Sequence, residues 1–214
     1  MNKSAIIIGS SGLVGSNLVN ELLDSPRFDS VIALVRKHTF DSHPKLKEII
    51  FDFDNEAAIE SLEPVNHIFC CLGTTIKKAG SKEAFRFVDY ELPLRFAYWA
   101  EKTNANSFSV VTAMGANSNS SIFYNKVKGE LEDQLKKRIL PKTHIFQPSL
   151  IMGPRKELRI GEMVGKALMT LISPFMIGSL KKYRGIHAQT IAKGMVYHLD
   201  NSENGVTVFE SDKI

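Results

Sequence analysis

The feature that most restricts the fold of this chain is a run of three glycines near its amino terminus. Gly9, Gly12 and Gly15 follow the short apolar run 4–9 and precede 13–23, whose apolar residues are spaced as on one face of a helix. In such a turn the first glycine permits the tight bend, the second lets the backbone approach a pyrophosphate, and the third lets the helix pack on the strand. Backbone N–H groups and the helix dipole would hold the phosphate charge. Three glycines in an ordinary turn are the alternative.

Strand and helix patterns alternate along the rest of the chain. The expected strands after the first are 30–35, 46–53, 67–72, 108–113, 142–146 and 206–209, and the expected helices are 13–23, 55–62, 81–103 with a bend at Pro93, 123–138, 161–171 and 188–199. This order predicts an α/β fold, a Rossmann-type doubly wound parallel sheet with helices on both faces. The ligand site is expected at the carboxyl ends of the strands.

The length of 214 residues fits one domain, and no repeat or low-complexity linker divides the chain. We therefore expect a single dinucleotide-binding domain over 1–214. Within it, about 149–214 would contribute a small lobe on the substrate side.

The charge and composition exclude several functional classes. The net charge of +4 comes from scattered basic residues, without a basic tail, so we expect no binding to nucleic acid. No apolar stretch reaches the length of a membrane span, and 164–180 is expected to pack on the core, with peripheral membrane contact as a minor alternative. The start of the chain does not resemble a secretory signal.

Cys70 and Cys71 are adjacent and predict free thiols in a reducing compartment, so a cytoplasmic location is expected.

The end of the second expected strand indicates which dinucleotide is bound. Enzymes that grip the ribose of NAD place an acidic residue there, but this chain has Arg36 and Lys37. A guanidinium can make a bidentate contact with a 2′-phosphate, and an ammonium adds a point charge. The sequence therefore predicts NADP(H), with a solvated Arg-Lys pair as the alternative.

Tyr124 and Lys128 are four residues apart and lie on the same face of the expected helix 123–138. A tyrosine acts as general acid or base only if its pKa is brought down from about 10, and a nearby ammonium favours the phenolate. Such a pair is common on helices, where it is often only solvated. Its position after the fifth expected strand of a glycine-fingerprint chain favours a catalytic pair.

Together these residues resemble an atypical short-chain dehydrogenase/reductase, of the group similar to the Tat-interacting protein and its bacterial relatives. The resemblance covers nearly the whole chain, and the stretches that carry it are 9–15, 33–37, 69–75, 78–80, 88–89, 123–130 and 148–159. The run Cys-Cys-Leu-Gly-Thr-Thr within 69–75 is the most specific of them.

The resemblance implies a set of NADPH contacts and a catalytic pair. Ser11 to Val14 would lie on the phosphates, Arg36 and Lys37 on the adenosine phosphate, and Leu72 and Gly73 along the adenosine half. Tyr124 and Lys128 would be the catalytic pair. The other residues expected to bind the cofactor are Gly9, Ser10, Gly12, Leu13, Gly15, Thr74, Ile151 and Arg159. Asp52 would bind on the adenine side. A helix N-cap at the neighbouring Asp54 is the alternative use of this pair of carboxylates.

Two positions depart from the pattern of the wider family. Active members place a serine or threonine at the end of the fifth strand to polarise the substrate carbonyl, and here Thr112 has that chemistry, with Ala113 at the expected spot. Gln147 stands where extended members have an arginine. These departures leave cofactor binding intact and put turnover in doubt.

Two functions follow from this sequence. The first is hydride transfer between NADP(H) and a small carbonyl or alcohol, with Tyr124 moving the proton, Lys128 orienting the ribose and Thr112 holding the substrate oxygen. The second is a non-catalytic NADP(H) sensor that acts through a protein partner.

The histidines lack metal-ligand spacing and no Gly-x-Ser-x-Gly elbow occurs, so neither a metal site nor a hydrolase is expected. The substrate is unspecified, and a monomer or homodimer is expected.

Overall fold

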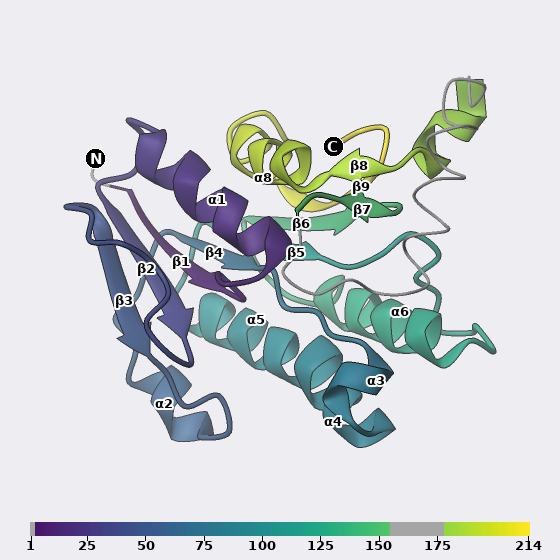
Figure 1. Ribbon diagram of the computed structural model, residues 1–214, viewed down its shortest axis with the longest axis horizontal. Coiled ribbons are helices and arrows are strands. Elements are labelled where there is room, and N and C mark those ends of the chain that lie inside the picture. The colour runs from purple at the N-terminus through teal and green to yellow at the C-terminus, as the bar shows by residue number, and fades with distance from the viewer. Residues whose placement is uncertain (1–2, 155–177) are drawn as a thin grey trace.

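The computed structural model describes residues 3–154 and 178–214. Seven parallel strands form one sheet in the order β3-β2-β1-β4-β5-β6-β9 (Figure 1). Their bounds are β1 (Ser4–Ile8), β2 (Ser30–Val35), β3 (Leu46–Ile50), β4 (His67–Cys70), β5 (Ser107–Val111), β6 (Lys142–Gln147) and β9 (Gly205–Glu210). The order reverses between β1 and β4, which places the topological switch point there. The predicted doubly wound parallel sheet is confirmed.

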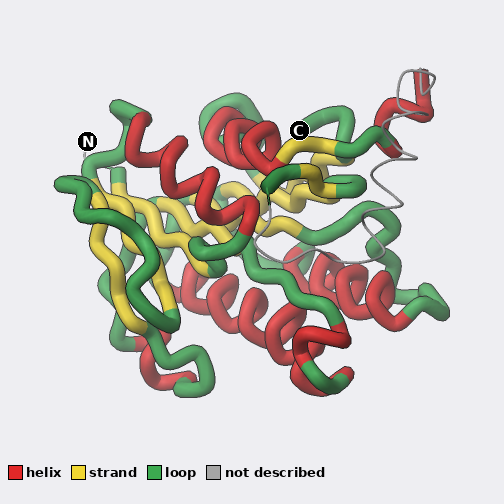
Figure 2. Tube along the Cα trace, in the orientation of Figure 1, coloured by secondary structure: helices red, strands yellow, loops and turns green. Residues whose placement is uncertain are grey.

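Helices cover both faces of the sheet, as Figures 1 and 2 show. On one face lie α1 (Leu13–Asp24) and α8 (Ala188–Tyr197), which pack against each other. On the other face lie α2 (Glu56–Glu60), α3 (Ile76–Ala79), α4 (Lys82–Arg86), α5 (Leu92–Lys102) and α6 (Phe123–Leu135). The expected helix 161–171 lies outside the described residues.

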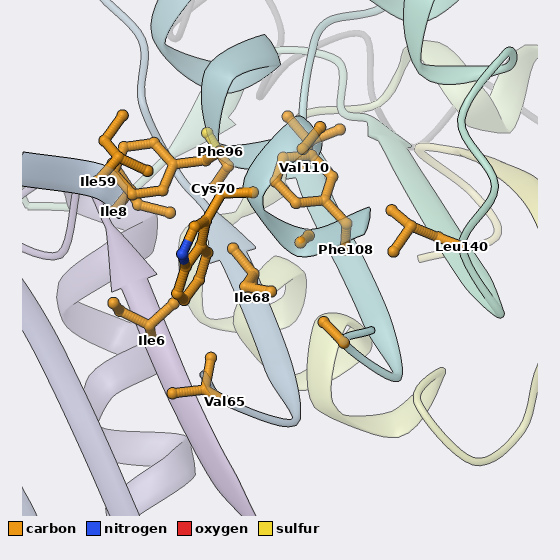
Figure 3. Close-up of a cluster of buried hydrophobic side chains, with 14 of the residues drawn as sticks. Ile6, Ile8, Ile59, Val65, Ile68, Cys70, Phe96, Phe108, Val110 and Leu140 are labelled. Carbon is orange, nitrogen blue, oxygen red and sulfur yellow. The ribbon is translucent and has the colours of Figure 1, made fainter. Parts of the chain in front are cut away.

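The strands are apolar on both faces because both faces are covered. Ile6 and Ile8 of β1 point to the side of α5, where they join Phe96 (Figure 3), and Ala5 and Ile7 join the cluster beneath α1 and α8. All four β1 side chains are fully buried. This double core makes β1 and its carboxyl end a rigid platform for the glycine turn.

The expected helix 81–103 is interrupted by a π-helical turn at Phe87–Glu91, between α4 and α5. The N–H of Leu92 bonds to the carbonyl of Phe87, five residues back. Pro93 has no N–H to give to the carbonyl four residues before it, so regular α geometry cannot continue through this point. The predicted bend is therefore a widened turn, and it carries Asp89.

Two short features were not expected from the sequence. β7 (Ile151–Met152) and β8 (Ile186–His187) form a separate parallel pair, and Gly178–Tyr183 is a 3₁₀ helix. Segments of two residues carry no periodicity, so the sequence gives no signal for them.

The connection between β2 and β3 contains no helix. Residues 36–45 return directly, and Phe40 packs against the cluster on the α1 face. Lys45 ends this connection by donating from Nζ to the carbonyls of Leu23 and Ser25 at the end of α1, at 3.0 Å each. The β2–β3 connection is thus tied to the helix that begins at the glycine turn.

Candidate functional site

The glycine turn follows β1 and has no room for side chains. At Gly9, with φ of +79°, a Cβ atom would lie 2.7 Å from the carbonyl carbon of Cys71. At Gly15 it would lie 2.2 Å from the carbonyl oxygen of Gly9, so α1 can approach β1 only without a side chain there. Both glycines are required by close packing, as the fingerprint predicts.

The start of α1 offers backbone donors to an anion. Gly12 is its N-cap, no side chain caps the helix, and the first turn has no acidic residue. Ser11 and Gly12 are exposed, and the N–H groups at the start of a helix have no intrahelical acceptor. This donor set fits a pyrophosphate, because the helix dipole adds positive potential at the same point.

The cations that the sequence predicts for a 2′-phosphate lie at the end of β2. Ser10, which is buried, donates its hydroxyl to the carbonyl of Leu34 at 3.3 Å and so ties the glycine turn to this strand end. Arg36 and Lys37 are exposed, and over residues 3–154 and 178–214 neither forms an ion pair. Their charge is available to a ligand.

Asp52 lies just beyond β3 and is exposed. Its carboxylate accepts the N–H of Asp54 at 3.1 Å. The cap of α2 is Asn55, which accepts the N–H of Ala57, so the alternative of an N-cap at Asp54 is wrong.

The loop after β4 runs past the glycine turn. The N–H of Cys71 bonds to the carbonyl of Ile8 at 2.8 Å, which continues the β1–β4 pairing to the switch point. Leu72, Gly73 and Thr74 follow, and the N–H of Thr74 donates to Asp89 at 2.9 Å. A Cβ on Gly73 would lie 3.8 Å from the same carboxylate. Asp89 therefore sits directly behind the loop predicted to hold adenosine.

The predicted catalytic pair lies on α6. Tyr124 is half-buried and its ring lies 5.7 Å from the ring of Phe85. The side chain of Lys128 is only 2% exposed, and its Nζ lies 2.8 Å from the carboxylate of Asp89. Burial would lower the pKa of Lys128, but the Asp89 carboxylate, aided by Tyr124, outweighs burial and raises it. Lys128 is thus a cation at neutral pH, one turn of α6 after Tyr124.

Asp89 is the main site residue that the sequence did not single out. It is fully buried in the π turn, forms an ion pair with Lys128 through one carboxylate oxygen and accepts the N–H of Thr74 with the other. Two signals pointed to it: the stretch 88–89 among those that carry the family resemblance, and Pro93 four residues later. Neither shows its partner, because Asp89 and Lys128 meet only through tertiary packing.

Thr112 lies one residue past β5 and is buried. Its hydroxyl donates to Glu132 of α6 at 2.7 Å and lies 3.2 Å from the carbonyl of Phe146. One hydroxyl proton is shared between these acceptors, so none is left for a substrate oxygen. The structure does not bring the Thr112 hydroxyl to Tyr124.

Glu132 forms a buried polar cluster with Thr112 and Gln147. Gln147 donates its amide to both carboxyl oxygens, at 3.0 and 2.9 Å. Burial raises the pKa of Glu132, and the hydrogen bonds from Thr112 and Gln147 offset this only in part. The amide of Gln147, where a guanidinium is usual in the wider family, thus leaves this carboxyl without a cation.

The remaining predicted positions are Ile151 and Arg159. Ile151 of β7 packs on the cluster that includes α1, and a Cβ on Gly153 would lie 3.0 Å from the Leu13 side chain. The segment around Ile151 therefore borders the phosphate turn. Arg159 lies outside the described residues.

Three further observations concern the described residues alone. They contain no group of three or more metal-ligating side chains, and none of their helices is long and apolar enough to cross a bilayer. The thiols of Cys70 and Cys71 are free, and burial raises the pKa of Cys70 to about 12. Such a thiol is no nucleophile at neutral pH.

Known proteins resemble this chain in sequence over most of its length. The profile of the HIM1 family matches residues 23–178. Protein FMP52, mitochondrial, of Debaryomyces hansenii is 33% identical over 158 residues, which cover 72% of this chain and 69% of that protein. Protein HTATIP2 of Rattus norvegicus is 31% identical over 169 residues, 77% of this chain and 69% of that protein. The resemblance to the group of the Tat-interacting protein is confirmed.

A solved structure confirms the fold independently. The Bordetella bronchiseptica enzyme WbmH, in complex with NAD+, superposes with a TM-score of 0.72 at 17% identity. The match covers 100% of this chain and 77% of WbmH. At this identity the likeness establishes the Rossmann-type fold.

The expected cytoplasmic location is wrong on the evidence of the relatives. FMP52 proteins from several fungi, among them Debaryomyces hansenii and Candida albicans, are named as mitochondrial. Adjacent free cysteines indicate a reducing environment around the thiols and do not distinguish one such compartment from another.

Proposed function

Because this chain belongs to the HIM1 family and has the fold of an NAD+-binding enzyme, we propose that it is an NADP(H)-binding oxidoreductase of the short-chain dehydrogenase/reductase type. The observation that carries the proposal is the buried Lys128–Asp89 pair at 2.8 Å, in which Lys128 follows Tyr124 by one turn of α6 and Asp89 accepts the N–H of Thr74 in the loop after β4. A buried ion pair contributes little net stability, so its occurrence at the carboxyl ends of the strands favours a functional role.

The cofactor would lie across the switch point. The uncapped start of α1 would hold the pyrophosphate, and Arg36 with Lys37 would hold the 2′-phosphate of NADP(H). The loop of Leu72, Gly73 and Thr74 would line the adenosine half. The lack of an acidic residue at the end of β2 favours NADP(H) over NAD(H).

When bound, the nicotinamide would supply or accept a hydride. Tyr124 would give or take the proton at the substrate oxygen. Lys128 would keep a positive charge close to the phenol, which favours the phenolate, and Asp89 would hold Lys128 in place. Asp89 is thus a positioning residue and Tyr124 the proton carrier.

A second function is favoured by one observation, the bonding of Thr112. Its hydroxyl donates to Glu132 and lies close to the Phe146 carbonyl, so the hydroxyl expected to polarise a substrate carbonyl is already engaged. A protein that binds NADP(H) without turnover, and signals the cofactor state to a protein partner, would need no such hydroxyl.

We further propose that the chain acts as a single domain. The segment from about residue 149 would provide the substrate side, since a Cβ on Gly153 would lie 3.0 Å from the Leu13 side chain, next to the phosphate turn. A small carbonyl or alcohol would bind there as substrate, to a monomer or a homodimer.

Titration with NADPH and with NADH, followed by nicotinamide fluorescence, tests the proposal. Wild type should bind NADPH in the micromolar range and NADH much more weakly. Arg36→Glu should weaken NADPH binding about 100-fold, because a bidentate charge-assisted contact becomes a repulsion, and change NADH binding little. An equal loss for both cofactors would remove the assignment of Arg36, and no binding of either would remove the proposal.

Turnover separates the two functions. NADPH bound to wild type is mixed with a panel of aldehydes and ketones, and Tyr124→Phe serves as the control. Oxidation of NADPH that disappears in the variant supports the enzyme. Tight binding without oxidation across the panel supports the sensor.

A further inference from the structure

Glu48 of β3 is a largely buried acid that the site described above does not use. Its side chain is 10% exposed, and β3 pairs with β2 so that Glu48 lies beside Ala33. From there it reaches the start of the β2–β3 connection, the segment that begins with Arg36 and Lys37. A carboxylate so close to two cations would be expected to pair with them.

Glu48 instead binds the backbone that follows the cations. One carboxyl oxygen accepts the N–H of Thr39 at 2.9 Å and the N–H of Phe40 at 3.1 Å. The other lies 3.1 Å from Nδ1 of His38. Burial pushes the pKa of Glu48 up, but these bonds outweigh it and lower the pKa. Glu48 is therefore an ionised anchor with its oxygens occupied.

Glu48 holds the turn that directly follows Arg36 and Lys37 at the end of β2. The hydroxyl of Thr39 donates to the carbonyl of Lys37 at 2.8 Å, so the turn from Lys37 to Phe40 is bonded internally and then to β3. Phe40 packs against the core on the α1 face. Without a helix in this connection, the described contacts that hold its start are these bonds and the burial of Phe40.

We propose that Glu48 sets the selectivity of this site for NADPH over NADH by positioning Arg36 and Lys37. This inference rests on the proposed function, since it assumes a 2′-phosphate beside these two residues. Satisfied by backbone donors, Glu48 leaves both cations unpaired. Ordering their backbone before binding lowers the entropy cost of gripping the phosphate.

The test is the ratio of the dissociation constants for NADH and NADPH in Glu48→Ala. Loss of the anchor should weaken NADPH binding about tenfold, the loss expected from one charge-assisted hydrogen bond, and leave NADH binding within about twofold. Simple electrostatics predicts the opposite sign, because removal of a negative charge near a phosphate should tighten NADPH binding. The direction of the change therefore separates positioning from charge.

Glu63→Ala is the matched control. Glu63 is exposed and forms no ion pair within the described ranges, and its removal changes the net charge by the same amount. It should leave both constants unchanged. Glu48→Gln retains one acceptor oxygen, so its ratio of dissociation constants should lie between those of wild type and Glu48→Ala. If Glu48→Ala does not fold, Glu48→Gln is tested by the same criterion.

The two failures are distinct. Wild type that shows no preference for NADPH overturns the proposed cofactor, and this inference with it, before any variant is made. Wild type that prefers NADPH, with an unchanged or increased ratio in folded Glu48→Ala, overturns the role of Glu48 alone. Equal weakening of both cofactors would show a structural role and would also overturn it.

Discussion

The two halves of the site treat their polar groups in opposite ways. On the side of β2, Arg36 and Lys37 are exposed and unpaired among the described residues, and the start of α1 is uncapped. On the side of α6, Lys128 is bonded to Asp89 and Thr112 to Glu132, all of them buried. The polar groups of the β2 side are available to a ligand, whereas those of the α6 side are already paired within the protein.

This difference predicts where a substitution acts. Changes on the α6 side should lower the free energy of unfolding, because each polar group there has a buried partner that would be left alone. Changes on the β2 side should alter cofactor affinity with little effect on stability. Unfolding in urea and cofactor titration on the same variants separate the two.

The largest effect is expected for Lys128→Met. It leaves the Asp89 carboxylate buried without a cation, which should lower the free energy of unfolding by about 3–5 kcal/mol. Lys126→Met, two residues earlier and exposed, is the control and should stay within about 0.5 kcal/mol. Addition of Asp89→Asn to Lys128→Met should restore part of the loss. A stable Lys128→Met would mean that the α6 side does not depend on this pair.

Thr112→Val comes next. It removes a donor from the buried Glu132 and should cost about 1–2 kcal/mol of unfolding free energy. Thr143→Val is the control, since the buried hydroxyl of Thr143 has no hydrogen-bond partner in the described structure, and it should be neutral or stabilising. If Thr112→Val abolished turnover at unchanged stability, Thr112 would belong to the catalytic machinery after all.

Glu132→Gln should change the pH dependence of stability. Because burial raises the folded pKa of Glu132, the folded protein holds this proton more tightly than the unfolded chain does. Wild type therefore loses stability as the pH rises from the usual glutamate range toward the raised pKa, and the variant does not. As the pH rises from the usual glutamate range through the raised pKa, the difference in unfolding free energy should therefore move in favour of Glu132→Gln.

Asp133→Asn is the control for that experiment, on the next residue of α6. A hydrogen bond from Ser118 lowers the pKa of Asp133, so the pKa of this acid is shifted in the direction opposite to that of Glu132. The side chain of Asp133 is about half-exposed, and its variant should lose little stability at pH 8. Parallel curves for wild type and Glu132→Gln would show that Glu132 titrates normally.

The smallest stability effect is expected for Arg36→Glu. Its side chain is exposed and unpaired in the described ranges, so the free energy of unfolding should change by less than about 0.5 kcal/mol while NADPH binding weakens. If Arg36→Glu lowered both the free energy of unfolding and the affinity for NADPH, the difference between the two sides of the site would be refuted.

The same contrast explains what the sequence could predict. The glycine turn and the Arg36-Lys37 pair are local, since spacing along the chain fixes both their position and their chemistry. The partners of Lys128 and Thr112 are distant in sequence, 39 and 20 residues away as the numbering of Asp89 and Glu132 shows. No periodicity in the sequence indicates such a contact between distant residues, so Tyr124 and Lys128 were predicted as a pair without Asp89, the acid that pairs with Lys128.

The helix-free connection of residues 36–45 also bears on how the chain folds. Among the neighbouring strands of the seven-stranded sheet, β2 and β3 are joined by the shortest segment, ten residues against the 36 residues, 71–106, that join β4 and β5. Loop-closure entropy grows with the logarithm of length, so the β2–β3 pairing costs about 1 kcal/mol less to close. Parallel sheets fold slowly because their contacts are non-local, and this pair is the least non-local contact in the sheet. We expect it to form early, so that the strand end bearing the two cations is built before the rest of the candidate site.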